Sequence, residues 1–133
     1  MKIVIQGIEY RVIAEGAYAT KSEPDKPYKK YKLNDNKALV ISDEEDFAFF
    51  GEDFGELDLE PGEKNINYKG TEFKLATEDY QILEKAVFGE PEGNLKFWDY
   101  ENGEQVISLG VKENGERSDV AGKVIDKKSI KFI

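Results

Sequence analysis

Apolar and polar residues alternate with a period of two over much of the chain, which is the pattern of half-buried β-strands. The first such segments are residues 3–5 and 10–14, on either side of Gly7. We therefore expect the chain to open with a β-hairpin. Similar segments follow the turn residues 34–37 (NDNK) and 101–104 (ENGE), where Asn-Gly is expected to take positive φ at both positions.

Helix and strand compete in residues 77–88. Thr77 could act as the N-cap of a helix with four apolar residues on one face: Tyr80, Leu83, Ala86 and Val87. The preceding Phe73 and Leu75 alternate like a strand, however. We therefore favour a long, bent strand over a helix.

A strand-like phrase near the N-terminus returns in the middle of the chain. Residues 5–12 (IQGIEYRV) and 68–75 (YKGTEFKL) share the order apolar, polar, Gly, any residue, Glu, aromatic, basic, apolar. Weaker matches follow, such as residues 40–42 with residues 106–108. Self-similarity of this kind indicates repeated structural units.

These patterns predict an all-β chain with little or no helix. We expect one β domain over residues 1–133, because this length fits a single shared core. Two similar antiparallel units, about residues 1–60 and 63–133, would pack as a sandwich or a semi-closed barrel, with the seam near Pro61-Gly62.

Composition excludes several classes of function. The 28 acidic and 19 basic residues give a net charge of −9, which opposes binding to nucleic acid because that affinity rests on neutralised phosphates. The chain has no Cys and no His, so disulfides, thiolate nucleophiles, His-based triads and the usual zinc sites are excluded. We predict no cofactor.

No apolar run approaches the length of a signal peptide or of a membrane-spanning helix. The simplest interpretation is a cytoplasmic protein.

An acidic stretch over residues 43–60 forms the first candidate site, and it begins with four consecutive carboxylates: Asp43, Glu44, Glu45 and Asp46. Calcium needs six to eight ordered oxygen ligands, and the EF-hand spacing is absent, so we favour a solvated acidic loop and predict no metal. Paired carboxylates could also hydrolyse glycosides, but that chemistry needs two carboxyls facing each other across a cleft.

Four aromatic residues on matching segments of the two units form the second candidate site: Tyr28, Tyr31, Trp98 and Tyr100. Lysines interleave them, so they could form a surface that stacks on a planar or cationic molecule or on a partner peptide, edged by the acidic loop. Aromatic residues also favour cores and cross-strand pairs. We regard a core role as the more common reason for such a pattern.

Several short motifs together give a resemblance to a known family. They are residues 5–12, the strand around Tyr31, the aromatic strand 96–100 leading through residues 101–103 into 106–109, and residues 122–126 before the last strand. The chain resembles the bacterial domain-of-unknown-function family DUF4178 over nearly its whole length. It departs from the family pattern at Leu39-Val40, where a Trp-Leu pair is common.

The resemblance implies a β-rich bacterial protein of the cytoplasm without an assigned activity. Some members are encoded near genes resembling those for polyamine synthesis or membrane stress, which implies a link to polyamines or to membrane maintenance. It transfers no catalytic residue to this chain.

Three functions remain open at this point. The first is a non-enzymatic binding or protein-interaction module, in stress or envelope physiology. The second is a small-molecule or polycation (polyamine-like) binder, and the third is a carboxylate-dependent enzyme.

Overall fold

The computed structural model describes residues 1–133 as eleven β-strands and one short 3₁₀ turn, with no α-helix. The strands are β1 (Lys2–Ile5), β2 (Ile8–Thr20), β3 (Tyr28–Leu33), β4 (Lys37–Ile41), β5 (Phe47–Gly55), β6 (Asn65–Tyr68), β7 (Thr71–Phe88), β8 (Leu95–Asn102), β9 (Gln105–Lys112), β10 (Asp119–Asp126) and β11 (Ile130–Phe132), with the 3₁₀ turn η1 at Lys127–Ser129. The expected all-β class is confirmed. The structure contains no helix with the length and apolar character needed to cross a membrane.

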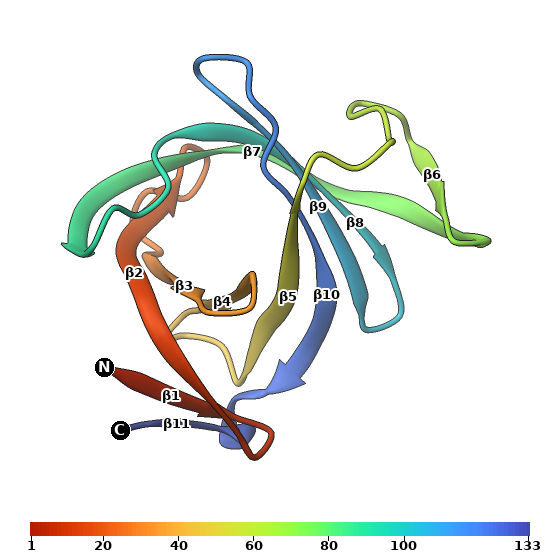
Figure 1. Cartoon of the computed structure of the whole chain (residues 1–133). Helices are drawn as coiled ribbons and strands as arrows, with labels where there is room; N and C mark the ends of the chain where they lie inside the picture. Colours follow the sequence, from red (N-terminus) through yellow and green to blue (C-terminus); the bar gives the residue numbers. More distant parts are fainter.

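Eight strands close into an antiparallel barrel in the order β2-β3-β4-β5-β10-β9-β8-β7, with β7 pairing back onto β2 (Figure 1). Two four-stranded meanders, β2 to β5 and β7 to β10, thus meet along two seams. The other three strands lie outside the barrel, β1 and β11 beside the start of β2 and β6 beside the start of β7. The sandwich and the semi-closed barrel were therefore wrong in detail, because the β2–β7 pairing leaves no open edge in the wall.

The barrel closes because β2 and β7 are longer than their hairpin partners. They have 13 and 18 residues, against 4 each in β1 and β6, so their second halves are free to pair with each other. A β-bulge separates the two halves of each strand, between Val12 and Ala14 and between Leu75 and Thr77. Bulges bend a strand and increase its twist, as barrel closure requires. The strand expected over residues 77–88 is confirmed as part of β7.

Tight turns set the register of the hairpins. Gln6-Gly7 and Lys69-Gly70 have positive φ at both positions, as type I′ turns require. Asp35-Asn36 does the same between β3 and β4, as expected for the NDNK turn. The turn after β8 differs from the prediction by one residue. Asn102 pairs with Gln105, so the turn is centred on Gly103 and Glu104, of which only Gly103 has a positive φ.

Two hydrophobic cores lie on the outer face of the barrel wall. In the first, the β1–β2 hairpin and β11 cover β3, β4 and β5 (Ile3, Ile5, Tyr10, Val12, Tyr31, Leu33, Leu39, Ile41, Ala48, Ile125 and Ile130). In the second, the β6–β7 hairpin and the β5–β6 linker cover β8 and β9 (Ile66, Phe73, Trp98, Tyr100, Ile107 and Leu109). Burial of these side chains stabilises the fold without requiring the barrel interior to be filled.

A buried ion pair holds the linker of residues 56–64 against the barrel. Asp119 is fully buried and accepts hydrogen bonds from the backbone N–H groups of Leu57 (2.8 Å) and Gly110 (3.1 Å). Arg117 donates to the same carboxylate through Nη2 (2.7 Å) and Nε (3.2 Å), and to the carbonyl of Leu59 (2.9 Å). The segment that joins the two halves is therefore fixed at one point of the wall.

Candidate ligand-binding cavity

The interior of the barrel contains a cavity of about 360 Å³, which we call the lumen. Eight-stranded barrels either fill their interior with side chains or enclose one small ligand. Packed protein interiors have few voids larger than a water molecule, whereas ligand sites begin at about 300 Å³. The lumen stays open because short side chains project into it, among them Ala38, Ser108 and Ser118.

Most of the lumen wall is apolar. Every second residue of each strand faces inward, and these positions carry aliphatic side chains such as Val40 and Val124 and the rings of Phe49 and Phe97. These four side chains are only half-buried, because they face the cavity rather than a packed core. The wall can therefore contact an apolar molecule at little cost in rearrangement.

Asp99 on β8 is the carboxylate that lies within this apolar wall. Its cross-strand neighbours are Thr77 on β7 and Ser108 on β9, and all three line the lumen. Burial raises the pKa of Asp99 to about 6, while a hydrogen bond with Ser108 and the charge of Lys30 act in the opposite direction and Glu101 raises it further. Asp99 is thus a desolvated acid whose charge a bound cation would stabilise.

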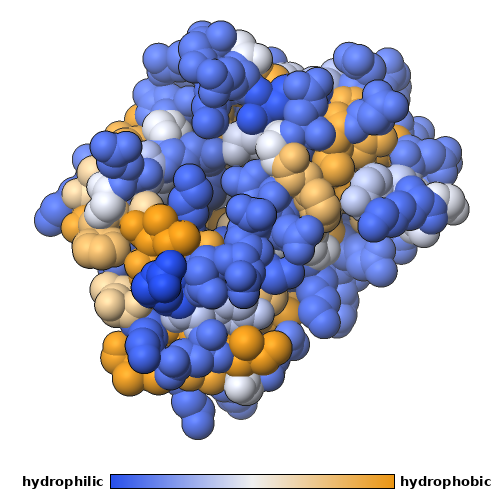
Figure 2. Space-filling model, viewed as in Figure 1, coloured by the Kyte–Doolittle hydropathy of each residue, from blue (hydrophilic) through white to orange (hydrophobic).

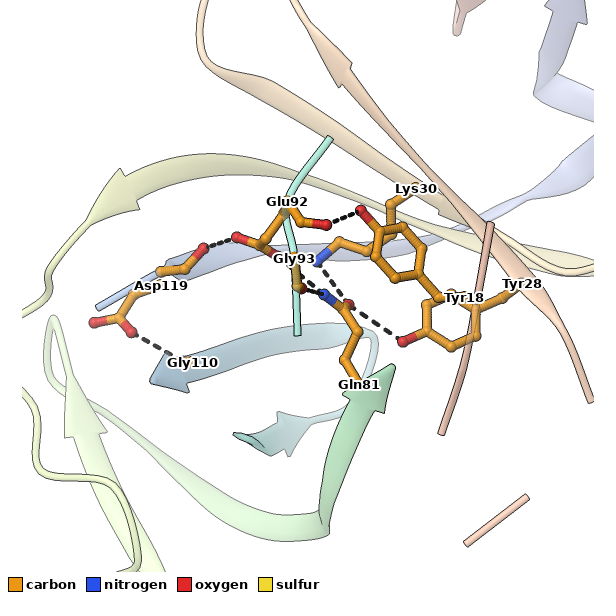
Figure 3. Close-up of polar contacts among 9 residues, drawn as sticks. Tyr18, Tyr28, Lys30, Gln81, Glu92, Gly93, Gly110 and Asp119 are labelled. Atoms are coloured by element: carbon orange, nitrogen blue, oxygen red, sulfur yellow. Dashed lines mark hydrogen bonds and ion pairs between the residues drawn. The ribbon is translucent and has the colours of Figure 1, made fainter. Parts of the chain in front are cut away.

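At one end of the lumen lie residues 90–93, between β7 and β8, which we call the plug. Glu92 and Gly93 accept hydrogen bonds from the lumen residues Lys30 and Gln81 (Figure 3). The carboxylate of Glu92 accepts hydrogen bonds from Lys30 Nζ (2.5 Å), from Gln81 Nε2 (3.3 Å) and from the Ser118 hydroxyl. Its backbone carbonyl accepts a hydrogen bond from the Tyr18 hydroxyl (2.6 Å). Figure 3 shows Tyr18, Lys30 and Gln81 pointing toward Glu92 and Gly93 from different strands of the wall.

The charges of the plug neutralise each other. Burial alone would raise the pKa of Glu92, but the charge of Lys30 and the hydrogen bonds from Lys30, Ser118 and Gln81 hold it below its usual value. The side chains of Lys30 and Glu92 are 22% and 20% exposed. Lys30 is the lysine that lines the lumen, and it is committed to Glu92.

A second, more polar hollow of about 490 Å³ lies on the other side of the plug. Lys30 and Ser118 line both hollows, so the Glu92 side chain bonded to them lies at the boundary. The turn at residues 35–37 and the start of the β2 wall segment also line this polar hollow.

The opposite end of the lumen forms its mouth. Phe47 and Glu101 line the cavity there and are exposed, and the loop of residues 42–46 leads directly into Phe47. The four predicted acidic residues Asp43, Glu44, Glu45 and Asp46 are exposed in this loop. The acidic segment therefore lies at the entrance to the cavity.

The four predicted aromatic residues do not form one exposed surface. Tyr28 faces the lumen, stacks on Tyr18 with ring centroids 5.7 Å apart, and donates a hydrogen bond to Gln81 (3.2 Å). Tyr31 lies on the opposite face of β3 and is 6% exposed in the first core. The period of two separates these two residues, because they are an odd number of positions apart.

Trp98 and Tyr100 belong to the second core. They are 9% and 0% exposed, and the Tyr100 hydroxyl donates to the carbonyl of Glu63 (2.7 Å) and accepts from the N–H of Gly62 (3.2 Å). The Trp98 indole N–H donates to Glu78. These two rings anchor the linker and the β6–β7 arm rather than a ligand.

The sequence analysis did not single out Gln81, Glu92 and Asp99, and it included Lys30 only among the lysines that interleave the aromatic residues. A signal existed for Asp99. Alternation along β8 places it opposite Trp98 and Tyr100, so burial of those rings would have put a carboxylate on the second, interior face of the strand. Glu92 gave no such signal, because its partners lie on four other segments of the chain.

Comparison with known proteins identifies no relative. No family model matches the chain, and neither the curated proteins nor the solved structures contain a significant match.

Proposed function

We propose that this protein binds one small, predominantly apolar molecule in the lumen of its barrel. The observation that carries the proposal is the cavity of about 360 Å³, lined by apolar side chains and by a few polar groups. The external position of both cores supports it, because the stability of the fold does not depend on filling the lumen. A non-enzymatic, small-molecule binding role follows.

The other functions expected from the sequence have less support. An aromatic docking surface would need exposed rings, and three of the four rings are buried. Figure 2 shows hydrophobic residues in separate patches on a largely hydrophilic face, not a broad apolar platform for a partner. The resemblance to DUF4178, the cytoplasmic location and the link to polyamines stay predictions.

We also infer that the two halves are copies of one unit. Each half consists of an outer hairpin followed by a four-stranded meander, and both hairpins turn through a type I′ pair. The plug has no equivalent in the first half, where residues 21–27 make the corresponding connection. Under this proposal the plug is a specialisation of the second unit.

The binding proposal is tested with N-phenyl-1-naphthylamine, an uncharged dye at neutral pH whose fluorescence rises in apolar surroundings. We expect saturable binding to the wild type and displacement by 1-octanol. The double variant Val40→Phe/Val124→Phe places two rings in the lumen, so we expect its affinity for the dye to fall by about ten-fold or more.

The matched control is Val87→Phe, the same substitution at an exposed position outside the lumen. It is expected to bind the dye like the wild type. Trp98 is the single tryptophan and lies outside the lumen, so its emission verifies that each variant is folded. Wild-type affinity in the folded double variant would overturn the proposal.

A further inference from the structure

We propose that the ligand of the lumen is an apolar molecule with a single protonated amine, and that this amine pairs with Asp99. The inference rests on the proposed function and adds the chemical class of the ligand. Its basis is the distribution of charge along the barrel interior, from the acidic mouth to the neutralised plug.

Asp99 is the charged group in the lumen that is available to pair with a ligand. Thr77 and Ser108 on the neighbouring strands are uncharged, and Tyr28 across the lumen stays protonated because burial raises its pKa. Glu101, two residues along β8, is exposed at the rim. An ammonium group placed beside Asp99 would replace the solvation that the carboxylate has lost.

An anionic ligand finds no partner in the same space. Lys30 is already paired with Glu92 at 2.5 Å, and the Gln81 amide donates to Glu92 and to the carbonyl of Gly93 (3.0 Å). A carboxylate in the lumen would instead lie between Asp99 and Glu92, both of which carry negative charge at neutral pH. The cavity therefore disfavours fatty-acid-like molecules.

The mouth also favours a cation. Residues 43–46 place four exposed carboxylates beside the entrance, against two lysines, Lys127 and Lys128, that share a hollow with Asp46. Lys127 Nζ donates to the carbonyls of Ser42 (2.7 Å) and Glu45 (3.2 Å), and Lys26 pairs with Glu23 (2.8 Å). Charge of one sign around a cleft raises the local concentration and association rate of an oppositely charged ligand.

The walls set the rest of the ligand's chemistry. Phe49, Phe97 and the aliphatic side chains around them offer no hydrogen bonds, and burial of a second ammonium against them would be costly. A polyamine carries several charges along its length, so it fits the mouth but not the interior. The geometry points to one amine and an apolar body.

The experiment measures the affinities of octylamine, 1-octanol, octanoate and spermidine by calorimetry at about pH 8, where the amines are protonated and Asp99 is ionised. We expect octylamine to bind the wild type about ten-fold or more tightly than octanol, and octanoate and spermidine to bind most weakly. In Asp99→Asn the preference for the amine over the alcohol is expected to disappear.

The matched control is Glu101→Gln, which removes the carboxylate at the rim of the same strand. It is expected to retain most of the preference for the amine. The amine affinity of the wild type should also rise between about pH 5 and pH 7 as Asp99 ionises.

The outcomes separate the two proposals. Equal binding of octylamine and octanol by the wild type, or an amine preference that persists in Asp99→Asn, overturns the amine assignment and leaves the lumen as a binding site for neutral molecules. Failure of octanol and of the uncharged dye to bind overturns the proposed function itself.

Discussion

Replacement of Asp119 by alanine is expected to destabilise this protein more than most single changes. The carboxylate is fully buried and accepts four hydrogen bonds, two from backbone N–H groups and two from the Arg117 guanidinium. Alanine removes every acceptor at once. It also leaves Arg117, whose side chain is 14% exposed, as a mostly buried cation without its partner.

The magnitude follows from the contacts. Removal of one member of a buried ion pair costs about 3–5 kcal/mol, because the remaining charge stays desolvated. Each stranded backbone N–H would add about 1 kcal/mol or more, but water that enters the space offsets part of this cost. We therefore expect Asp119→Ala to lower the free energy of unfolding by about 3–5 kcal/mol, out of about 5–15 kcal/mol for a typical domain.

The assay is urea unfolding followed by Trp98 fluorescence. With an m-value of about 2 kcal/mol/M, the expected loss moves the midpoint down by about 2 M. Hydrogen exchange adds local detail, since the amides of Leu57 and Gly110 lose their acceptor and should exchange faster.

Asp58→Ala is the matched control, because Asp58 is exposed in the same linker. Its midpoint should stay close to that of the wild type. If Asp119→Ala unfolds within about 1 kcal/mol of the wild type, the buried network does not stabilise the fold and the reasoning is refuted.

Three further predictions concern the wall, the plug and the lumen. Gly122→Ala should lower the free energy of unfolding in urea by about 1–3 kcal/mol, because a Cβ at this position would lie 2.2 Å from a backbone carbonyl oxygen of β5. Gly93→Ala is the control and should be nearly neutral, because a Cβ at Gly93 would meet no atom within 4 Å. Glu92→Gln should lower the free energy of unfolding by about 1–3 kcal/mol at pH 7, and by progressively less as the pH falls below 4.5. The pKa of Glu92 is lowered in the folded state, so the stability that its charge provides is lost as the pH falls through the folded value; a loss that does not change with pH would contradict this. Asp99→Asn should be about 1–3 kcal/mol more stable than the wild type above pH 6 and equal to it below about pH 4. The raised pKa of Asp99 makes the stability of the wild type fall as the pH rises from 3.8 to about 6. Thermal unfolding across that pH range is the test, and a constant difference between the two proteins would refute the argument.

The local structure of this chain was largely predictable. Alternation placed the strands, and Gly or Asn with positive φ placed the turns at Gly7 and at residues 35–36. The choice of strand for residues 77–88 was correct, because the pairing of β7 with β2 and β8 satisfies its backbone along the whole length. The turn after Asn102 was displaced by one residue, since Asn102 is still paired with Gln105 and so belongs to the strand rather than to the turn.

The candidate site was only partly predictable. Of the acidic stretch predicted to be a solvated loop, residues 43–46 lie in an exposed loop and residues 47–55 form β5. Nothing local in the sequence shows that residues 43–46 lie at the mouth of a cavity. The aromatic residues had two interpretations, an exposed binding surface or a buried core. The period of two shows which residues of a strand share a face, but it does not show which face is covered. Tyr31, Trp98 and Tyr100 lie beneath the outer hairpins, so their rings are buried.

The sequence by itself determined the strands, their turns and the absence of Cys and His chemistry, because these depend on residue type and on contacts between near neighbours. Only the tertiary structure decided that β2 pairs with β7, that the cores lie outside the barrel, and that Asp99, Lys30 and Glu92 share one interior. Those relations join residues far apart in the chain. Their energies depend on burial and on distance in space, and neither quantity is encoded in the local alternation of polar and apolar residues.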